Sequence, residues 1–180
     1  AEYPLKTFQK SSDEIAKFIT IGRLSKEKGH IRILKTLSLL KFQFHYTIIG
    51  EGPQKDMIFN TINKYNLNKN ITYIPFTQDV YKFLSESDLF LQGSYVEGFP
   101  NTVIESCYVG TPVLAFNAPG GTKEIIINQI NGCLVKTEKE YLHYLNNQPE
   151  LSPLEIRNSV KAKFNKQKII SQYEKLLDSL

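Results

Sequence analysis

The chain has 180 residues, of which 41% are hydrophobic and 22% are charged, and its formal net charge at pH 7 is +4. This length and composition predict one globular domain that buries roughly 70% of the surface of its unfolded chain. A charge of this size is too small to indicate nucleic acid as a partner, and no apolar run approaches the roughly 20 residues that span a bilayer.

The chain is predicted to consist of a polar lead-in (residues 1–15), a core (16–150) and C-terminal helices (151–180), without an internal linker or repeat. It begins with Ala1 and has no signal-peptide pattern, so we expect a piece of a longer protein. Cys107 and Cys133 lie in apolar patterns without metal-ligand spacing. They are expected to be reduced thiols of a cytoplasmic protein.

Short apolar runs alternate with helical patterns along the whole chain. Strands are predicted over residues 18–21, 44–49, 71–74, 88–91, 112–116 and 131–135. Helices are predicted between them over residues 31–40, 57–62, 80–85, 103–108 and 122–127, and after them over residues 151–163 and 166–180. This alternation predicts an α/β fold, a doubly wound, Rossmann-like parallel sheet of about six strands with helices on both faces. Ligands of such sheets bind at the carboxyl ends of the strands.

The stretch from residue 94 to residue 105 carries the strongest local signal, because it combines a strand end, a Gly-Pro turn and a helix start. Pro100 suits the first position of the helix, and Asn101 or Thr102 can supply a capping oxygen. Free amides and the helix dipole at such a junction favour a phosphate. Glu97 and Glu105 flank it and could accept hydrogen bonds from sugar hydroxyls. In an isolated pair of this kind, however, Glu97 would more often be a solvated loop residue, and Glu105 would more often interact with the dipole of its helix.

Other predicted strand ends carry glycines and cations. Arg23 offers a planar fork for two phosphate oxygens, and Lys28 offers a point charge at the start of the next helix. The turn at residues 50–52 reads Gly-Glu-Gly, which permits close approach of a ligand but lacks the third glycine of a dinucleotide fingerprint. Taken alone, each of these features is more often a solvated loop or a tight turn.

Five motifs that follow one another in a fixed order favour a functional site over solvated loops and tight turns. They are Gly22-Arg23-Leu24 with Lys28-Gly29, Gly50-Glu51-Gly52, Glu97-Gly98-Phe99-Pro100-Asn101 with Glu105, Gly110-Thr111-Pro112-Val113, and Gly120-Gly121 with Glu124. Their order resembles the carboxyl-terminal half of retaining glycosyltransferases of the GT-B fold, in the large group called family 4 or group 1. The resemblance covers roughly residues 18–135.

The resemblance implies a role for each matching residue. Arg23 and Lys28 would neutralise the diphosphate of a nucleotide-sugar donor, most simply a UDP-sugar, and so stabilise the leaving group. Glu97 would bind the transferred sugar, and Glu105 the ribose hydroxyls. The residues implied to contact the nucleotide sugar are Gly22, Gly52, Phe76, Gln78, Gly98, Phe99, Pro100, Asn101, Thr102 and Glu105. Related proteins often have a small residue where this chain has Phe76, so the base site departs most from the pattern.

The resemblance also implies what the whole protein does. A hexose or N-acetylhexosamine would pass, with its anomeric configuration kept, to a glycan or lipid-linked acceptor in bacterial surface polysaccharide synthesis. No Asp-x-Asp motif occurs, so no metal and no cofactor besides the donor is expected. The acceptor-binding N-terminal domain is absent from this chain, which is therefore expected to transfer nothing alone. The full-length enzyme is expected in the cytoplasm, where it can lie against the inner face of the plasma membrane.

Two other functions stay open at this point. A nucleotide-sugar epimerase of the same shape would lack the two glutamates spaced around Gly-Phe-Pro. A non-catalytic nucleotide-binding module would have lost Arg23, Lys28 or Glu105, and all three are present. The three histidines, His30, His45 and His143, show no catalytic pairing and are expected at the surface or half-buried.

Overall fold

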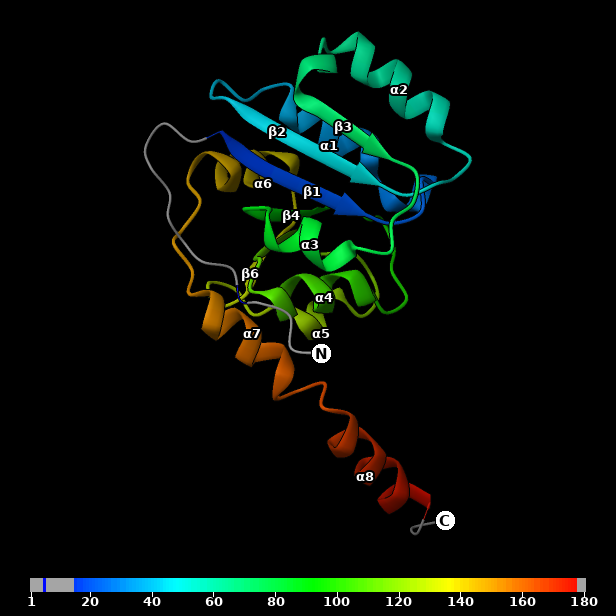
Figure 1. The fold of residues 1–180 in the computed structure, drawn as a ribbon, viewed down its shortest axis with the longest axis vertical. Coiled ribbons are helices and arrows are strands. Elements are labelled where there is room, and N and C mark those ends of the chain that lie inside the picture. Colours follow the sequence, from blue (N-terminus) through cyan, green and yellow to red (C-terminus); the bar gives the residue numbers. More distant parts are fainter. Residues whose placement is uncertain (1–4, 6–14, 178–180) are drawn as a thin grey trace.

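A parallel sheet of six strands forms the centre of the structure, a computed structural model that describes residue 5 and residues 15–177 (Figure 1). The strand order is β3-β2-β1-β4-β5-β6, and every pairing is parallel. The elements are β1 (Ala16–Ile21), η1 (Lys26–Lys28), α1 (His30–Leu37), β2 (Phe44–Ile49), α2 (Lys55–Lys64), η2 (Asn68–Asn70), β3 (Ile71–Ile74), α3 (Val80–Ser85), β4 (Leu89–Gln92), α4 (Asn101–Val109), β5 (Val113–Phe116), α5 (Thr122–Ile125), β6 (Gly132–Val135), α6 (Glu138–Asn146), α7 (Pro153–Lys161) and α8 (Lys166–Leu177).

Both faces of the sheet are covered, as the near-continuous apolar strands predict. Successive residues of a strand point to opposite faces, so Phe18 joins the cluster under α1, α2 and α6, whereas Ile19 joins the cluster under α3, α4 and α7. Leu91 and Phe90 of β4 divide between the clusters in the same way. The predicted doubly wound, Rossmann-like α/β class is therefore confirmed.

The strand order contains one switch point. Strand β1 lies between β2 and β4, with Phe18 opposite Leu89 in the β1–β4 register. After β1 the chain builds outward through β2 and β3, and then returns to build β4, β5 and β6 on the other side. The helices that follow β1 and β4 cover opposite faces of the sheet, and open α/β sheets bind their ligands at such a switch point.

Most predicted elements occur within one or two residues of their expected ends, but α6 was missed. Thr137 caps this helix by accepting a hydrogen bond from the Glu140 amide (3.1 Å). Tyr141 and Leu145, one turn apart, are both fully buried against the sheet. A Thr-x-x-Glu capping signal followed by apolar residues at helical spacing was therefore present in the sequence.

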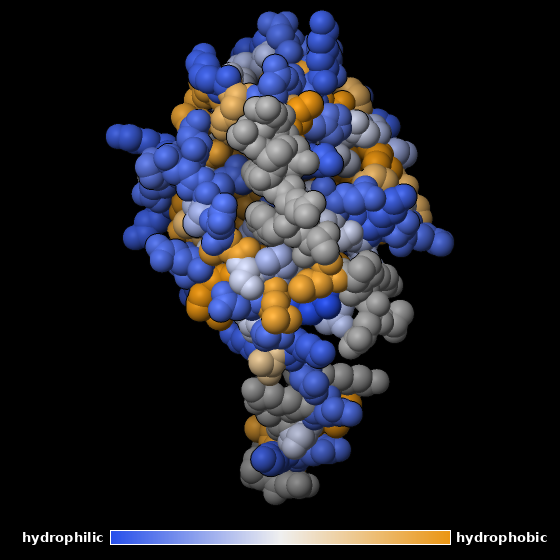
Figure 2. Space-filling view, turned by 60° about the vertical axis from the view of Figure 1, so that its left-hand side comes forward, coloured by the Kyte–Doolittle hydropathy of each residue, from blue (hydrophilic) through white to orange (hydrophobic). Residues whose placement is uncertain are grey.

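The C-terminal helices were predicted at about the right places. Helix α7 packs against α4, and α8 extends away from the body of the domain (Figure 1). In Figure 2, hydrophilic side chains cover most of the coloured surface, and hydrophobic ones form separate patches scattered between them. The last three residues of the predicted helix (178–180) and most of the predicted lead-in (1–4 and 6–14) lie outside the described residues. Among the described helices, none has the length and apolarity to cross a membrane.

Candidate functional site

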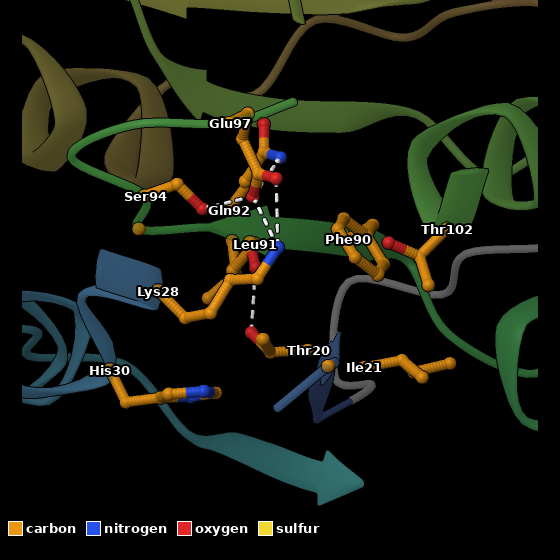
Figure 3. A pocket seen from close by; sticks show the side chains of 12 residues that line it. Thr20, Ile21, Lys28, His30, Phe90, Leu91, Gln92, Ser94, Glu97 and Thr102 are labelled. Carbon is orange, nitrogen blue, oxygen red and sulfur yellow. Dashed lines mark hydrogen bonds and ion pairs between the residues drawn. The ribbon is translucent and has the colours of Figure 1, made fainter. Parts of the chain in front are cut away.

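An ion pair marks the switch point. Lys28, at the end of η1, places its Nζ 2.8 Å from both carboxylate oxygens of Glu97, which lies in the loop after β4 (Figure 3). The two residues are 69 positions apart in the chain, and the parallel pairing of β1 with β4 brings their loops together. The Glu97 side chain is 5% exposed and that of Lys28 is 31% exposed. The pair is thus largely withdrawn from water, where a charge interaction is stronger than at the surface.

Glu97 is held by further contacts. Its Oε1 accepts hydrogen bonds from Gln92 Nε2 (3.1 Å) and Ser94 Oγ (2.5 Å), and its backbone amide donates to the carbonyl oxygen of Pro119 (2.9 Å). These partners come from β4, from its following loop and from the loop after β5. The carboxylate therefore has a fixed direction, which a group that recognises sugar hydroxyls requires.

A small polar cavity lies beside this pair, lined by residues of both loops. Its lining residues are Thr20, Ile21, Gly22, Lys28, His30, Phe90, Leu91, Gln92, Gly93, Ser94, Glu97 and Thr102 (Figure 3). Four residues predicted to contact the donor thus meet around one space: Gly22, Lys28, Glu97 and Thr102.

His30 corrects one prediction, since it is fully buried rather than half-buried or at the surface. It opens α1, and its Nε2 lies 3.3 Å from the carbonyl oxygen of Arg23. Burial lowers the pKa of His30 to about 4, so the ring is neutral at pH 7. His30 Nδ1 and Gln92 Oε1 are buried polar atoms that have no partner within the described chain. Because both residues line the cavity, these atoms can serve a bound hydroxyl or water.

Helix α4 brings free amides to the same place. The helix begins at Asn101 with Pro100 as its N-cap, and neither Asn101 nor Thr102 supplies the predicted side-chain cap. In the part of the chain that the structure describes, the amides of Gly98, Phe99, Asn101 and Thr102 donate to no backbone carbonyl. These donors and the helix dipole favour an anion beside the cavity.

Glu105 lies on the same face of α4 as Thr102, three residues earlier, which lines the cavity, but Glu105 is not itself a lining residue. The Glu105 carboxylate is half-buried, and burial raises its pKa. Within the described residues it has no hydrogen-bond or ion-pair partner. A half-buried carboxylate without a partner is unfavourable in the free domain and is ready to accept hydrogen bonds from a ligand.

Several predicted site residues do not line the cavity. Arg23 is exposed, in the loop that also carries Lys28, and its side chain does not line the cavity. Phe76 is 75% exposed and Gln78 is also exposed, on the loop after β3. Strand β3 is two positions from β1 in the sheet, so this loop lies further along the carboxyl edge. Phe99 is half-exposed and packs edge-on against Phe164, with ring centroids 5.6 Å apart.

The glycines at the site divide into two kinds. A Cβ added to Gly22 or Gly98 would meet no atom within 4 Å, and neither residue has positive φ. The fold itself therefore does not need glycine at these two positions. A Cβ added to Gly52 would lie 2.4 Å from the carbonyl oxygen of Leu24, so close backbone packing explains that glycine. This separates glycines that leave room for a ligand from glycines that the fold requires.

Gly98→Ala is accordingly expected to leave the domain folded, with unfolding free energy unchanged or up to about 1 kcal/mol higher because the unfolded chain loses freedom. Its affinity for the UDP-sugar donor that the sequence predicts should fall by roughly tenfold or more, since the new methyl group overpacks the ligand space. Chemical denaturation and calorimetry measure the two effects.

The matched control is Gly120→Ala in the adjoining loop. Gly120 has φ of +116°, and its added Cβ would lie 1.7 Å from the Glu97 carbonyl oxygen. This control should destabilise the domain by about 1–3 kcal/mol. If Gly98→Ala destabilises the domain as much as Gly120→Ala, the fold itself requires glycine at position 98, and the space beside it is not evidence for a ligand.

The fold and the site together define a Rossmann-like domain with an oriented ion pair and free helix amides at its switch point. The family model described as glycosyl transferases group 1 matches residues 5–159, and the chain belongs to this family. Its sheet corresponds to the C-terminal half of a GT-B glycosyltransferase.

Individual relatives agree with this membership. The N-acetylgalactosamine-N,N'-diacetylbacillosaminyl-diphospho-undecaprenol 4-alpha-N-acetylgalactosaminyltransferase of Campylobacter jejuni is 32% identical over 136 residues, which are 73% of this chain and 37% of that protein. The apo form of the lipopolysaccharide outer core galactosyltransferase WaaB superposes with a TM-score of 0.86 at 17% identity, over 98% of this chain and 52% of that one. Anabaena HepE in complex with UDP-glucose gives a TM-score of 0.80 at 22% identity, over 92% and 49% of the two chains. The chain thus spans between about a third and about half of the length of these relatives.

Proposed function

We propose that this chain binds the donor of a retaining glycosyltransferase, a UDP-linked hexose or N-acetylhexosamine. The observation that carries the proposal is the Lys28–Glu97 pair at the switch point, beside the free amides of α4. A cation and helix amides suit a diphosphate, and a fixed carboxylate suits sugar hydroxyls. A nucleotide sugar presents both kinds of group side by side. The UDP-glucose named for the HepE complex supports the choice of base.

Each residue then has a distinct role. Lys28 and the exposed Arg23 neutralise the diphosphate, so that the negative charge growing on the leaving nucleotide is stabilised. Glu97 accepts hydrogen bonds from the transferred sugar, and Glu105 accepts them from the ribose. No side chain acts as a nucleophile in this scheme. Support for metal-independent chemistry is that Lys28 and Arg23 already supply positive charge for the diphosphate.

Donor binding requires a change at Lys28. In the free domain both oxygens of Glu97 share the lysine, so an arriving diphosphate competes with the carboxylate for it. Gln92 and Ser94 keep Glu97 oriented while Lys28 turns toward the phosphates. Glu97 is therefore held in place before and after the donor arrives, which reduces the ordering cost of binding, whereas releasing Lys28 from the pair opposes binding.

The acceptor of the complete protein is proposed from its relatives. A diphospho-undecaprenol compound is named for the Campylobacter relative and lipopolysaccharide for WaaB, so we favour a glycan or lipid-linked acceptor in bacterial surface polysaccharide synthesis. The acceptor would bind to a preceding domain, and the reaction would occur in the cytoplasm, with the enzyme against the inner face of the plasma membrane. Membership in a glycosyl transferase family disfavours the epimerase and the non-catalytic module.

The test is a calorimetric comparison of UDP, GDP, ADP and UDP-glucose on the 180-residue chain. UDP is expected to bind about tenfold or more tightly than the other two diphosphates, because each base contact contributes a hydrogen bond of about 1 kcal/mol or more. The chain alone should transfer no sugar. Equal affinities for the three diphosphates would contradict the UDP assignment, and transfer by the isolated chain would contradict the need for a second domain.

A further inference from the structure

Arg32, on α1, makes an unusual set of contacts for an arginine. Its Nε donates to the carbonyl oxygen of Gly93 and its Nη2 donates to that of Ser94. The guanidinium lies between two aromatic rings, 3.5 Å from the ring centroid of Phe116 and 4.1 Å from that of Tyr95. Within the described chain it forms no ion pair with a carboxylate. Its planar fork thus serves two backbone carbonyls rather than a charge.

These contacts hold the segment from Gly93 to Glu97 against η1 and α1. The Tyr95 amide donates to the Glu27 carbonyl oxygen (2.8 Å), which gives the segment a second attachment. The two backbones also approach each other closely at Gly29, since a Cβ added there would lie 1.9 Å from the Gly93 carbonyl oxygen. The loop that carries Glu97 is therefore pinned to the loop that carries Lys28.

Gly93 and Ser94 are the first two residues after β4, where the chain leaves the sheet. Ser94 is also a direct partner of the Glu97 carboxylate through its hydroxyl group. A shift of Ser94 would move both the hydroxyl group and the peptide chain that leads to Glu97. Arg32 makes no such bond to Lys28, which lies in η1, or to Asn101 and Thr102, which open α4.

We propose that Arg32 is a positioning residue for the sugar half of the site, fixing the place of Glu97 through Gly93 and Ser94. The proposal rests on the proposed function, in which Glu97 binds the transferred sugar. Arg32 itself touches no substrate. Its loss should therefore impair recognition of the sugar while leaving the nucleotide contacts in place.

The test compares Arg32→Met and Arg32→Lys with wild type. Methionine keeps an unbranched stem between the rings, and lysine also keeps the charge, but neither can donate to two carbonyls in a fork. Lys35→Met is the matched control, because it removes a cation from the same helix, where Lys35 pairs with the exposed Glu138 at 2.8 Å.

The first measurement is amide hydrogen exchange without ligand. Exchange at Tyr95 and Glu97 should rise by about tenfold or more in both Arg32 variants, since local opening becomes easier there, and should stay as in wild type in Lys35→Met. Exchange in the central strands should not change in any variant. If Tyr95 and Glu97 exchange at the wild-type rate in Arg32→Met, the proposal is wrong.

The second measurement is calorimetry with UDP and with UDP-glucose. The Arg32 variants should bind UDP within about threefold of wild type but lose about tenfold in affinity for UDP-glucose. An equal loss for both ligands would show a general structural role and overturn the proposal. If the wild-type chain binds neither ligand, the proposed function is wrong, and the exchange measurement alone decides whether Arg32 positions Glu97.

Discussion

Lys28→Met is expected to lower the free energy of unfolding by about 3 kcal/mol, because it leaves a buried carboxylate without its charge partner. The Glu97 side chain is 5% exposed, and Lys28 bonds both of its oxygens at 2.8 Å. Gln92 and Ser94 remain as partners, but neither carries a charge. Affinity for UDP should fall by about a hundredfold, since the same lysine is the best-placed cation for the diphosphate.

The double variant Lys28→Met/Glu97→Gln separates these two effects. It removes both charges, so a large part of the lost stability should return, as it does when both members of a buried pair are replaced by neutral groups. Affinity for UDP should not return. Urea denaturation and calorimetry on the three proteins measure both quantities. If Lys28→Met is as stable as wild type, Lys28 is not an essential charge partner of Glu97. If UDP binding recovers in the double variant, Lys28 is not the cation that binds the diphosphate.

Glu105→Gln is expected to weaken UDP binding by roughly tenfold to a hundredfold, the effect of losing charged hydrogen bonds of about 1.5–3 kcal/mol. Folding should not suffer at neutral pH and can improve, because the half-buried carboxylate has no partner among the described residues. Glu150→Gln, which removes the same charge from an exposed loop, is the matched control. It should leave both binding and stability nearly unchanged. UDP binding by Glu105→Gln at wild-type strength would remove Glu105 from the nucleotide site.

The pH dependence of stability gives a second test at Glu105. Burial raises the pKa of this carboxyl in the folded chain above its unfolded value, so folding favours the protonated form. The destabilising contribution is absent below the unfolded pKa and is fully present once pH exceeds the folded pKa. The stability difference between Glu105→Gln and wild type should therefore be smallest in acid, rise above about pH 4.3, and level off toward neutral pH. A difference that does not change with pH would mean that Glu105 is not withdrawn from water.

Local patterns in the sequence predicted much of this fold. The β-branched and aromatic runs identified all six strands, and the confirmed class follows from their alternation with helices. Strand ends were within about two residues because the apolar pattern defines the strand interior better than its ends. Helix α6 was missed although Thr137 and Glu140 marked its start. The cap of α4 was predicted wrongly, since Pro100 precedes the helix rather than opening it.

Some of the residues that meet at the candidate site were predicted, but their contacts were not. Gly22, Lys28, Glu97 and Thr102 line one cavity, whereas Arg23, Phe76 and Gln78 lie on loops outside it, and the roles of all these residues stay predictions. No local pattern indicated that His30 would be fully buried there. Nothing in local spacing distinguishes this histidine from a surface one. Its burial follows from the way α1 packs beside the β4 loop.

The strand-helix alternation, the glycine turns and the order of the motifs can be read from the chain alone, because each of these depends on neighbouring residues. Only the folded domain shows that β1 and β4 are neighbours, that Lys28 and Glu97 meet across 69 residues, and that Arg32 bonds the loop that leads to Glu97. These contacts depend on which strands pair and on how helices pack over them. Such choices are made by long-range burial and hydrogen bonding, which no local pattern specifies.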